Sequence, residues 1–210
     1  MSAGLLYSGG KDSAFCLQVC SDVTHLITTY DRERGRLPIQ GIRLSIIRLQ
    51  AQRLGLELIE VPLPPNADNK AWIRGIRRGI KGKGLTSLVF GDLFLEDIRQ
   101  FRERALAGTE CEVRFPLWGK DTATMARRIQ DSGIECRLCS VNALAVPTTY
   151  LSAHYDQRLL ESLPVGVDPC GENGEFHTIV TAAPGMAPIE LTPEGTIEAL
   201  GYTILDYAPT

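Results

Sequence analysis

The stretch Ser8-Gly9-Gly10-Lys11-Asp12-Ser13 decides the fold, because it separates an apolar run at residues 4–7 from a helix-like segment at residues 13–20. The apolar run predicts a buried strand, and the segment after the glycines predicts a helix packed on a sheet. Two glycines let the backbone turn sharply and approach an anion without a clash at Cβ. The following helix points free N–H groups and the positive end of its dipole at the same place.

The side chains of this stretch extend the same argument. Ser8 and Ser13 add hydroxyl donors, and Lys11 adds a positive charge. Asp12 would repel phosphate if it pointed inward, so we expect it to face a magnesium ion or the helix end. The Walker loop and the dinucleotide fingerprint both require glycine spacings that are absent here. A plain strand-to-helix turn is the remaining alternative, and it needs no such elaborate sequence. We therefore predict a phosphate-binding loop.

Strands and helices keep alternating up to about residue 110. Further strands are predicted at residues 25–30, 57–63 and 85–90, and helices at residues 43–54, 71–80 and 96–106. This order predicts an α/β fold with a mostly parallel, doubly wound, Rossmann-like sheet. Ligands of such sheets lie outside the carboxyl ends of the strands. The loops predicted at those ends carry the glycines and acids, namely residues 8–13, Tyr30-Asp31 and Gly91-Asp92.

The pattern changes beyond Trp118. Helices are predicted at residues 122–132 and 154–163, and a strand-like stretch at residues 135–146. A loop rich in glycine and acids follows at residues 166–178, and two short strand-like runs and a Pro/Gly-rich tail complete the chain. We expect residues 1–118 to form a nucleotide-binding domain and residues 119–210 a smaller α+β lobe that closes over it.

The net charge and the lengths of the apolar runs indicate which classes of binding partner to expect. The 210 residues carry a net charge of -3, which gives no general attraction to nucleic acid. One basic stretch, within residues 74–83, is either a solvated helix face with its exit loop or a site for an anion. No apolar run approaches the roughly 20 residues of a membrane span, and no signal peptide is visible. A cytoplasmic location without a membrane partner, and with the six cysteines reduced, is therefore expected.

The hexapeptide at residues 8–13 closely resembles the PP-loop of the N-type ATP pyrophosphatase superfamily. The resemblance implies an adenine nucleotide alpha hydrolase-like fold, with the loop binding the β and γ phosphates of ATP. A substrate oxygen then attacks the α phosphate and releases pyrophosphate, and a nucleophile such as ammonia or sulfide displaces AMP. Gly91 and Asp92 are expected to contact the nucleotide or its magnesium ion; the alternative for Asp92 is a helix cap.

Further stretches resemble the diphthine–ammonia ligase family, also described as diphthamide synthase domain proteins. They are residues 91–97 with residues 102–104, the sequence Pro116-Leu117-Trp118-Gly119, and above all residues 166–178. The resemblance covers nearly the whole chain. It implies amidation of the carboxylate of diphthine, a modified histidine on a translation elongation factor, with ATP, Mg²⁺ and ammonia. Residues 36–43 depart from this pattern and look more like a bacterial branch, in which another carboxylate would be the acceptor.

The resemblance and the loop composition together give a set of site residues. We expect Asp12, Glu175 and His177 to be catalytic. If Phe176 faces the core, Glu175 and His177 both face the cleft, where His177 would orient the acceptor or move a proton from ammonia. The expected substrate-binding residues are Glu96, Asp97, Arg102, Cys170, Gly171, Glu172, Asn173, Gly174 and Thr178. For Glu96 and Asp97 the alternative is the acidic first turn of a helix.

The cysteines can be read as chemical groups or as buried structural residues. Cys170 is a candidate nucleophile, but adenylation needs no thiol and a free cysteine is often a buried filler. Cys136 and Cys139 form a C-x-x-C on a predicted strand, where residues three apart point to opposite faces. No second pair with metal-ligand spacing accompanies them, so no protein metal centre is predicted.

Two alternatives to the ligase hypothesis remain. One is a tRNA-modifying enzyme, because other PP-loop proteins carry out tRNA thiolation. The other is an ATP-binding sensor without turnover. The sequence does not identify the acceptor or the ammonia source, and a homodimer is possible.

Overall fold

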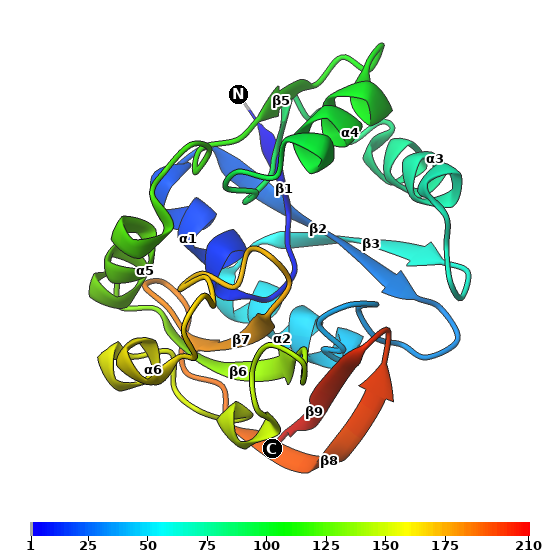
Figure 1. Ribbon diagram of the computed structural model, residues 1–210. Helices are drawn as coiled ribbons and strands as arrows, with labels where there is room; N and C mark the ends of the chain where they lie inside the picture. Colours follow the sequence, from blue (N-terminus) through cyan, green and yellow to red (C-terminus); the bar gives the residue numbers. More distant parts are fainter. Residues whose placement is uncertain (1) are drawn as a thin grey trace.

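The computed structural model describes residues 2–210 and contains two sheets (Figure 1). The first sheet has the order β3-β2-β1-β4-β5, and every neighbouring pair is parallel. Its strands are β1 (Ala3–Leu6), β2 (Val23–Asp31), β3 (Glu57–Leu63), β4 (Ser87–Val89) and β5 (Glu112–Arg114). The strand order reverses between β1 and β4, and the crevice of a doubly wound sheet opens at such a point. The predicted parallel α/β fold is confirmed.

Helices cover both faces of this sheet, as the alternation of elements requires. They are α1 (Lys11–Val19), α2 (Leu44–Leu54), α3 (Asn69–Ile80) and α4 (Glu96–Leu106). Side chains of β1 alternate between the two faces: Ala3 and Leu5 pack with α1 and α2, whereas Leu6 packs with the core beneath α3 and α4. Because successive side chains of a strand point to opposite faces, β1 contributes to two separate hydrophobic cores.

The second sheet is antiparallel and has the order β7-β6-β9-β8. Its strands are β6 (Glu135–Val141), β7 (Phe176–Ala182), β8 (Leu191–Ala199) and β9 (Tyr202–Pro209), accompanied by α5 (Thr122–Asp131), the 3-10 helix η1 (Thr148–Tyr150) and α6 (Gln157–Ser162). β7 lies against α1 and β9 against α2. One buried cluster therefore joins the first sheet, through Leu5 and Ile47, to the second sheet, through Leu138 and Ile179.

Capping residues determine where several helices begin or end. Asp68, Asp121 and Asp156 each accept a hydrogen bond from a backbone N–H three residues later, which caps α3, α5 and α6. Gly55 ends α2 with a left-handed φ of 66°. None of the helices within residues 2–210 is long and apolar enough to cross a bilayer.

The structure differs from the sequence-based expectations in several places. β6 ends at Val141, before the predicted end of the strand-like stretch at residue 146. β5 was not predicted, because Glu112–Arg114 is short and mostly polar. β7 begins at Phe176, inside the segment expected to be a loop. The last residues form the hairpin β8–β9 and not a Pro/Gly-rich tail. Pro193 and a strand irregularity before Gly195 fit into β8 because β8 is an edge strand.

Candidate active site

The phosphate loop is held from two sides. Gly9 has a φ of +76°, and a Cβ at this position would lie 2.5 Å from Cδ1 of Ile47. The Gly9 carbonyl accepts hydrogen bonds from the Val180 N–H of β7 (2.9 Å) and from Nε2 of Gln50 in α2 (3.4 Å). Gly10 is the N-cap of α1 and has no side chain to satisfy the first turn. The loop is therefore rigid and presents the N-terminus of α1 to a ligand.

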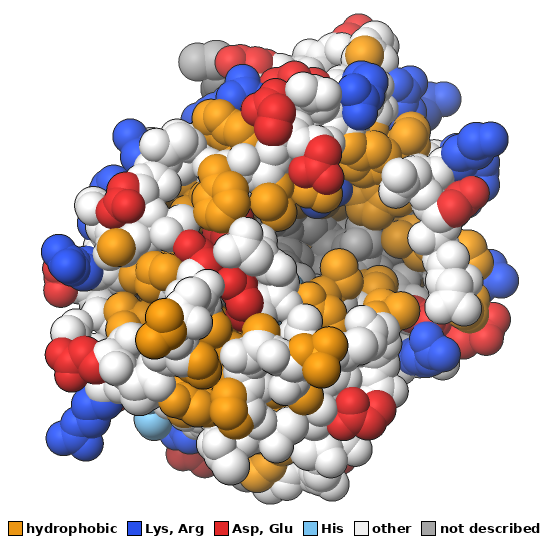
Figure 2. Space-filling view, viewed as in Figure 1, with side chains coloured by type: hydrophobic (Ala, Val, Ile, Leu, Met, Phe, Trp, Pro, Cys, Tyr) orange, Lys and Arg blue, Asp and Glu red, His pale blue; other side chains and the backbone are white. Residues whose placement is uncertain are grey.

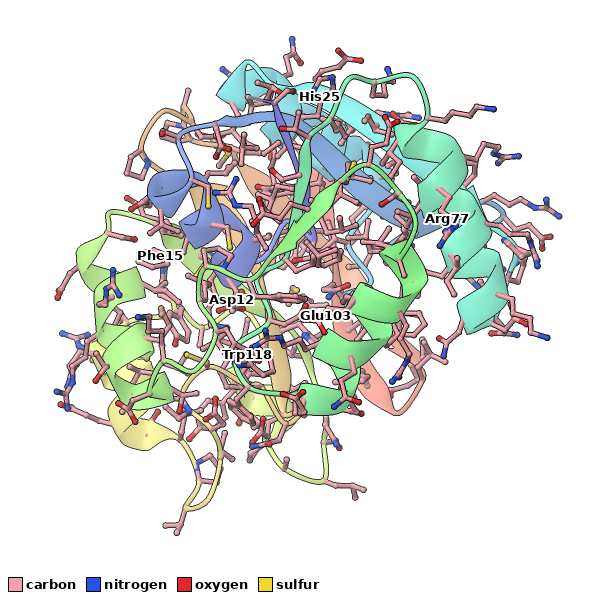
Figure 3. The ribbon with its side chains drawn as sticks, turned by 90° about the horizontal axis from the view of Figure 1, so that it is seen from above. Asp12, Phe15, His25, Arg77, Glu103 and Trp118 are labelled. Carbon is pink, nitrogen blue, oxygen red and sulfur yellow. The ribbon has the colours of Figure 1, made fainter. Side chains whose placement is uncertain are left out.

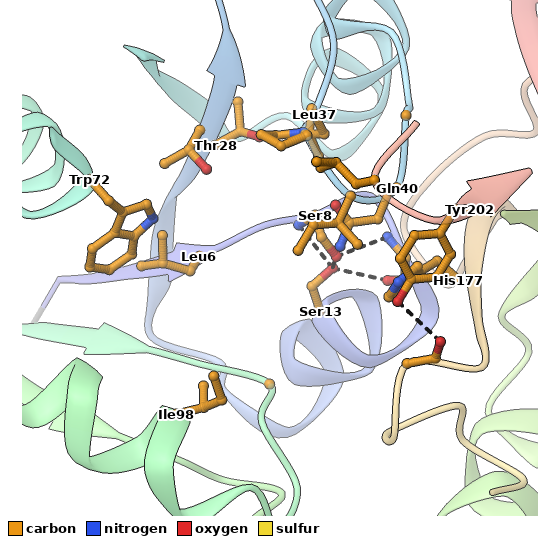
Figure 4. Close-up of a pocket in the computed structure, with 18 of the residues that line it drawn as sticks. Leu6, Ser8, Ser13, Thr28, Leu37, Gln40, Trp72, Ile98, His177 and Tyr202 are labelled. Carbon is orange, nitrogen blue, oxygen red and sulfur yellow. Dashed lines mark hydrogen bonds between the residues drawn. The ribbon is translucent and has the colours of Figure 1, made fainter. Parts of the chain in front are cut away.

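A cleft of about 1540 Å³ opens over this loop at the carboxyl ends of the parallel strands. Figure 2 shows the hollow, with hydrophobic side chains around its rim. In the close-up, the lining extends from Trp72 and Ile98 on one side, past Ser8 and Ser13, to His177 and Tyr202 on the other (Figure 4). The two halves of the chain thus contribute to a single cleft.

Most of the expected site residues meet in this cleft. Those that line it are Ser8, Gly10, Lys11, Asp12, Ser13, Gly91, Asp92, Asp97, Arg102, Cys170, Gly171, Glu172, Asn173, Gly174, His177 and Thr178. Gly9 belongs to the loop but does not line the cleft, because it lies against Ile47 and Gln50 of α2. Glu96 is exposed on α4 and accepts a hydrogen bond from Gln100 four residues later, as an ordinary helical pair does.

Carboxylates gather next to the phosphate loop. Oδ1 of Asp12 and Oδ2 of Asp92 are buried and accept no hydrogen bond from residues 2–210. Burial, together with the nearby charge of Asp12, raises the pKa of Glu172 to about 8. Burial also raises the pKa of Asp92. Within the described residues no three His, Cys, Asp or Glu side chains are close enough to hold a metal ion on their own.

The surroundings of the Lys11 side chain differ from those expected of a lysine in a phosphate-binding loop. It is 3% exposed, and its Nζ donates to the Cys170 carbonyl (2.5 Å) and to Oδ2 of Asp12 (2.9 Å). Burial alone would lower the pKa of Lys11, but the charge and hydrogen bond of Asp12 together with the nearby Cys170 and Glu172 outweigh it, and the pKa is raised. The ammonium is therefore turned into the protein interior, toward the second half of the chain.

Glu175 and His177 lie on opposite sides of the loop-to-strand junction, and only His177 lines the cleft. Phe176 is buried, as expected. Glu175 does not face the cleft: its two oxygens accept hydrogen bonds from the N–H groups of Asp168 (2.9 Å) and Asn173 (3.0 Å). Those N–H groups need partners because the loop has no regular ladder. The expectation that both side chains would face the cleft is therefore met only by His177.

The His177 imidazole is neutral near pH 7. Burial and the positive charge of Lys11 lower its pKa to about 4. Its ring lies against Tyr202, with 5.1 Å between centroids, and its Nε2 is buried without a hydrogen-bond partner among residues 2–210. The Tyr202 hydroxyl donates to the Gly174 carbonyl (3.0 Å), which joins the hairpin β8–β9 to the loop.

Arg102 and Cys170 occupy contrasting environments. The Arg102 guanidinium lies 4.7 Å from the ring centroid of Trp72 and 5.1 Å from that of Phe90, and burial lowers its pKa. Cys170 donates its thiol hydrogen to the Thr122 carbonyl (3.3 Å), and burial raises its pKa to about 12. A thiol in this environment is a poor nucleophile.

The basic stretch and the C-x-x-C do not line the cleft, although the Cys139 thiol donates to the carbonyls of two cleft residues, Gln40 (3.7 Å) and His177 (3.5 Å). Arg77 uses its guanidinium on the carbonyls of Ala105 and Ala107 at the end of α4, and Figure 3 shows it far from Asp12. Cys136 and Cys139 are 2% and 1% exposed, and burial raises the pKa of both thiols.

Sequence reasoning missed two hydroxyl groups. Tyr7 and Thr28 line the cleft, and each is buried with an oxygen that has no partner among residues 2–210. Both lie at or near the carboxyl ends of predicted strands. Polar groups at those positions were the signal that could have identified them.

The family comparison agrees with this geometry. Residues 1–108, which carry the phosphate loop and Asp92, match the family model described as diphthamide synthase N-terminal domain. A search of curated proteins finds no match to the chain. The match covers the part of the chain that forms most of the parallel sheet, and it indicates a PP-loop enzyme that uses ATP. The chain therefore belongs to the diphthamide synthase N-terminal domain family, a PP-loop ATP pyrophosphatase domain family.

Proposed function

We propose that the protein is an ATP-dependent ligase that adenylates a carboxylate and then amidates it with ammonia, forming AMP and pyrophosphate. One observation carries the proposal. The phosphate loop at the N-terminus of α1 and the loop at residues 170–178 line the same cleft, which leaves room beside the nucleotide for a second substrate. A binding-only protein would not need the second set of polar groups.

The reaction divides into two displacements. A carboxylate oxygen of the acceptor forms a bond to the α phosphorus, and the bond from that phosphorus to the bridging oxygen of pyrophosphate breaks. Ammonia then forms the C–N bond, AMP leaves with the electrons of the C–O bond, and the nitrogen loses a proton. In this scheme the free backbone N–H groups at the N-terminus of α1 bind the β and γ phosphates, with Ser8 and Ser13 as hydroxyl donors. The Lys11 N–H is not among them, because it donates to Oγ1 of Thr178 (3.1 Å).

The residues near the acceptor have separate roles in the proposal. Glu172 lines the cleft, where its Oε2 accepts a hydrogen bond from the Leu93 N–H (3.4 Å), and in its ionised form it would take the proton from the attacking nitrogen. His177 orients the acceptor through its free Nε2. Glu175 holds the shape of the loop. Asp97 and Arg102 also line the cleft, with Nε of Arg102 3.7 Å from Oδ2 of Asp92, and they would contact substrate.

A magnesium ion belongs to the proposal, and the residues fit it. Oδ1 of Asp12 and Oδ2 of Asp92 are buried and accept no hydrogen bond from residues 2–210, and Oδ2 of Asp92 lies 3.7 Å from Nε of Arg102. Mg²⁺ in nucleotide sites uses one or two carboxylates together with phosphate oxygens and water, so a complete protein cage is not required. When bound, the ion neutralises charge on the phosphates. Asp12 and Asp92 are the residues that would hold it.

The acceptor is diphthine or another carboxylate on a protein or small molecule. The test incubates the protein with ATP, Mg²⁺ and ammonium, with protein and small-molecule fractions of a cell extract as acceptors. AMP and pyrophosphate are measured. Ser13→Ala should abolish the fraction-dependent AMP, whereas Ser45→Ala, at an exposed position of α2, should not change it.

The products formed from ATP distinguish the ligase from the alternative functions. ADP and phosphate in place of AMP and pyrophosphate would exclude the ligase. Stoichiometric ATP binding without AMP in any fraction would favour a sensor. AMP that depends on an extract fraction but not on ammonium would point to another nucleophile.

A further inference from the structure

We propose that Lys11 is a positioning residue: its buried ammonium fastens the acidic loop, residues 168–175, to the phosphate loop and does not bind the phosphates of ATP. The proposal rests on the proposed ATP site and not on the amide-forming step. It gives this lysine a role in the assembly of the site, in place of the direct phosphate contact that its position in the loop suggests.

The ammonium of Lys11 has two hydrogen-bond acceptors and two aromatic rings around it. A lysine has three N–H groups. One donates to the Cys170 carbonyl and one to Oδ2 of Asp12. The ammonium also lies 5.4 Å from the ring centroid of Tyr155 and 5.6 Å from that of Phe176. These rings favour a cation, so the side chain needs no further anion.

Residue 11 holds both ends of the segment that carries the polar cleft residues. Its side chain binds the carbonyl of residue 170, and its backbone N–H donates to Oγ1 of Thr178 (3.1 Å). The neighbouring Gly9 carbonyl accepts from the Val180 N–H. Glu172, Asn173 and His177 lie between these anchors. Lys11 therefore contributes to setting their distance from the phosphates, together with the Leu93 N–H, which donates to Glu172 (3.4 Å).

The acidic loop is expected to move as one unit, because hydrogen bonds connect its residues to one another. Asp168 accepts from the Cys170 N–H through Oδ1 (2.8 Å), and its own N–H donates to Glu175 (2.9 Å). Glu175 also accepts from the N–H of Asn173 (3.0 Å). An anchor at the Cys170 carbonyl therefore restrains the whole loop.

A swing of Lys11 toward a phosphate would break this arrangement. The Cys170 carbonyl would lose its donor inside the protein, and Asp12 would lose its cation. Buried polar groups left without partners are costly. The backbone N–H groups of the α1 N-terminus already supply donors to an anion.

The experiment compares Lys11→Met and Lys11→Gln in the full chain with Lys70→Met, at an exposed position of α3. Amide hydrogen exchange is followed in residues 168–178 without nucleotide. Binding of α,β-methylene ATP with Mg²⁺ is measured by calorimetry. Lys11→Met should speed exchange in this segment and change the Kd by less than about threefold, because no phosphate contact is lost. Lys11→Gln still donates to the carbonyl, so its exchange should lie between those of Lys11→Met and the parent.

Two results would overturn the proposal. A side chain that contacts a phosphate contributes at least about tenfold to affinity. If the Kd for α,β-methylene ATP rises by that factor in both Lys11 variants and is unchanged in Lys70→Met, Lys11 is a nucleotide contact. Unchanged exchange in residues 168–178 of both variants would show that the ammonium does not fasten the loop. Both readouts are independent of AMP formation, so the ligase can fail while this proposal stands.

Discussion

At the scale of single residues, Gly9 shows how tightly the phosphate loop is enclosed. Its φ of +76° lies in the left-handed region, and a Cβ there would approach Ile47 to 2.5 Å and Oε1 of Gln50 to 2.9 Å. Gly35 has a similar φ of +63°, but a Cβ there meets nothing within 4 Å. The two glycines separate the cost of the backbone conformation from the cost of crowding.

We predict that Gly35→Ala lowers the free energy of unfolding by about 1 kcal/mol, the cost of a left-handed backbone for alanine. Gly9→Ala should lower it by about 3 kcal/mol, because the added methyl group also overpacks the core. It should also weaken binding of α,β-methylene ATP, which Gly35→Ala leaves unchanged. Urea unfolding and calorimetry measure the two effects. Equal destabilisation by both variants would contradict the crowding argument.

At the scale of elements, the hairpin β8–β9 is joined to the segment at residues 36–43 by the carboxylates of Asp206 and Glu194, of which Asp206 is the more buried. Asp206 accepts two hydrogen bonds from Arg36 (2.6 and 2.7 Å) and two from Arg43 (2.8 and 2.6 Å). Burial alone would raise the pKa of Asp206, but the two guanidinium groups hold it at about 2. This folded-state pKa lies below the ordinary value of 3.8. The contribution to stability is therefore present above about pH 4 and is lost as the pH falls toward 2.

Asp206→Asn should lower the free energy of unfolding by about 3 kcal/mol at pH 7, because it leaves Arg36 without a carboxylate partner and Arg43 with only the exposed Glu194. The difference from the parent should shrink as the pH falls toward 2. Glu60→Gln is the matched control, since Glu60 pairs with the exposed Arg48 and should cost less than about 1 kcal/mol. Thermal unfolding across pH tests both variants. A loss from Asp206→Asn that is the same at every pH would contradict this account.

At the scale of the whole molecule, the two sheets share one core. The buried cluster runs from Leu5 and Ile47 to Leu138 and Ile179, and β7 and β9 cover α1 and α2. The division proposed at residues 118 and 119 falls between β5 and α5. It therefore separates two sheets that are packed together.

We predict that the full chain unfolds in one transition and that residues 1–118 alone do not form a native core. Without the second sheet, the apolar faces of α1 and α2 would be exposed to water, and burial of apolar surface is the main driving force of folding. Coincident urea transitions by near- and far-ultraviolet circular dichroism test the first statement. A fragment of residues 1–118 with native near-ultraviolet dichroism would contradict the second.

Sequence reasoning succeeded where the signal was local. The bounds of β3 and α4 agree with the predicted ranges, because a Gly precedes β3, prolines follow it, and an acidic first turn marks the start of α4. The phosphate loop was predictable for the same reason. The orientation of Lys11 was not, because its partner, the Cys170 carbonyl, is 159 residues away in the chain. The role of Glu175 was also hidden, since it depends on which N–H groups of an irregular loop need an acceptor.

The edge of the second sheet has a consequence for behaviour at high concentration. β8 ends the order β7-β6-β9-β8, so its outer side has no neighbouring strand within residues 2–210. An open edge can recruit a strand from another molecule and start aggregation. Pro193 has no N–H to offer, and the irregularity before Gly195 bends the strand. Charged Glu194 and Glu198 are also exposed there. The edge is therefore a poor template, and replacing Pro193 with a β-branched residue would favour fibril formation.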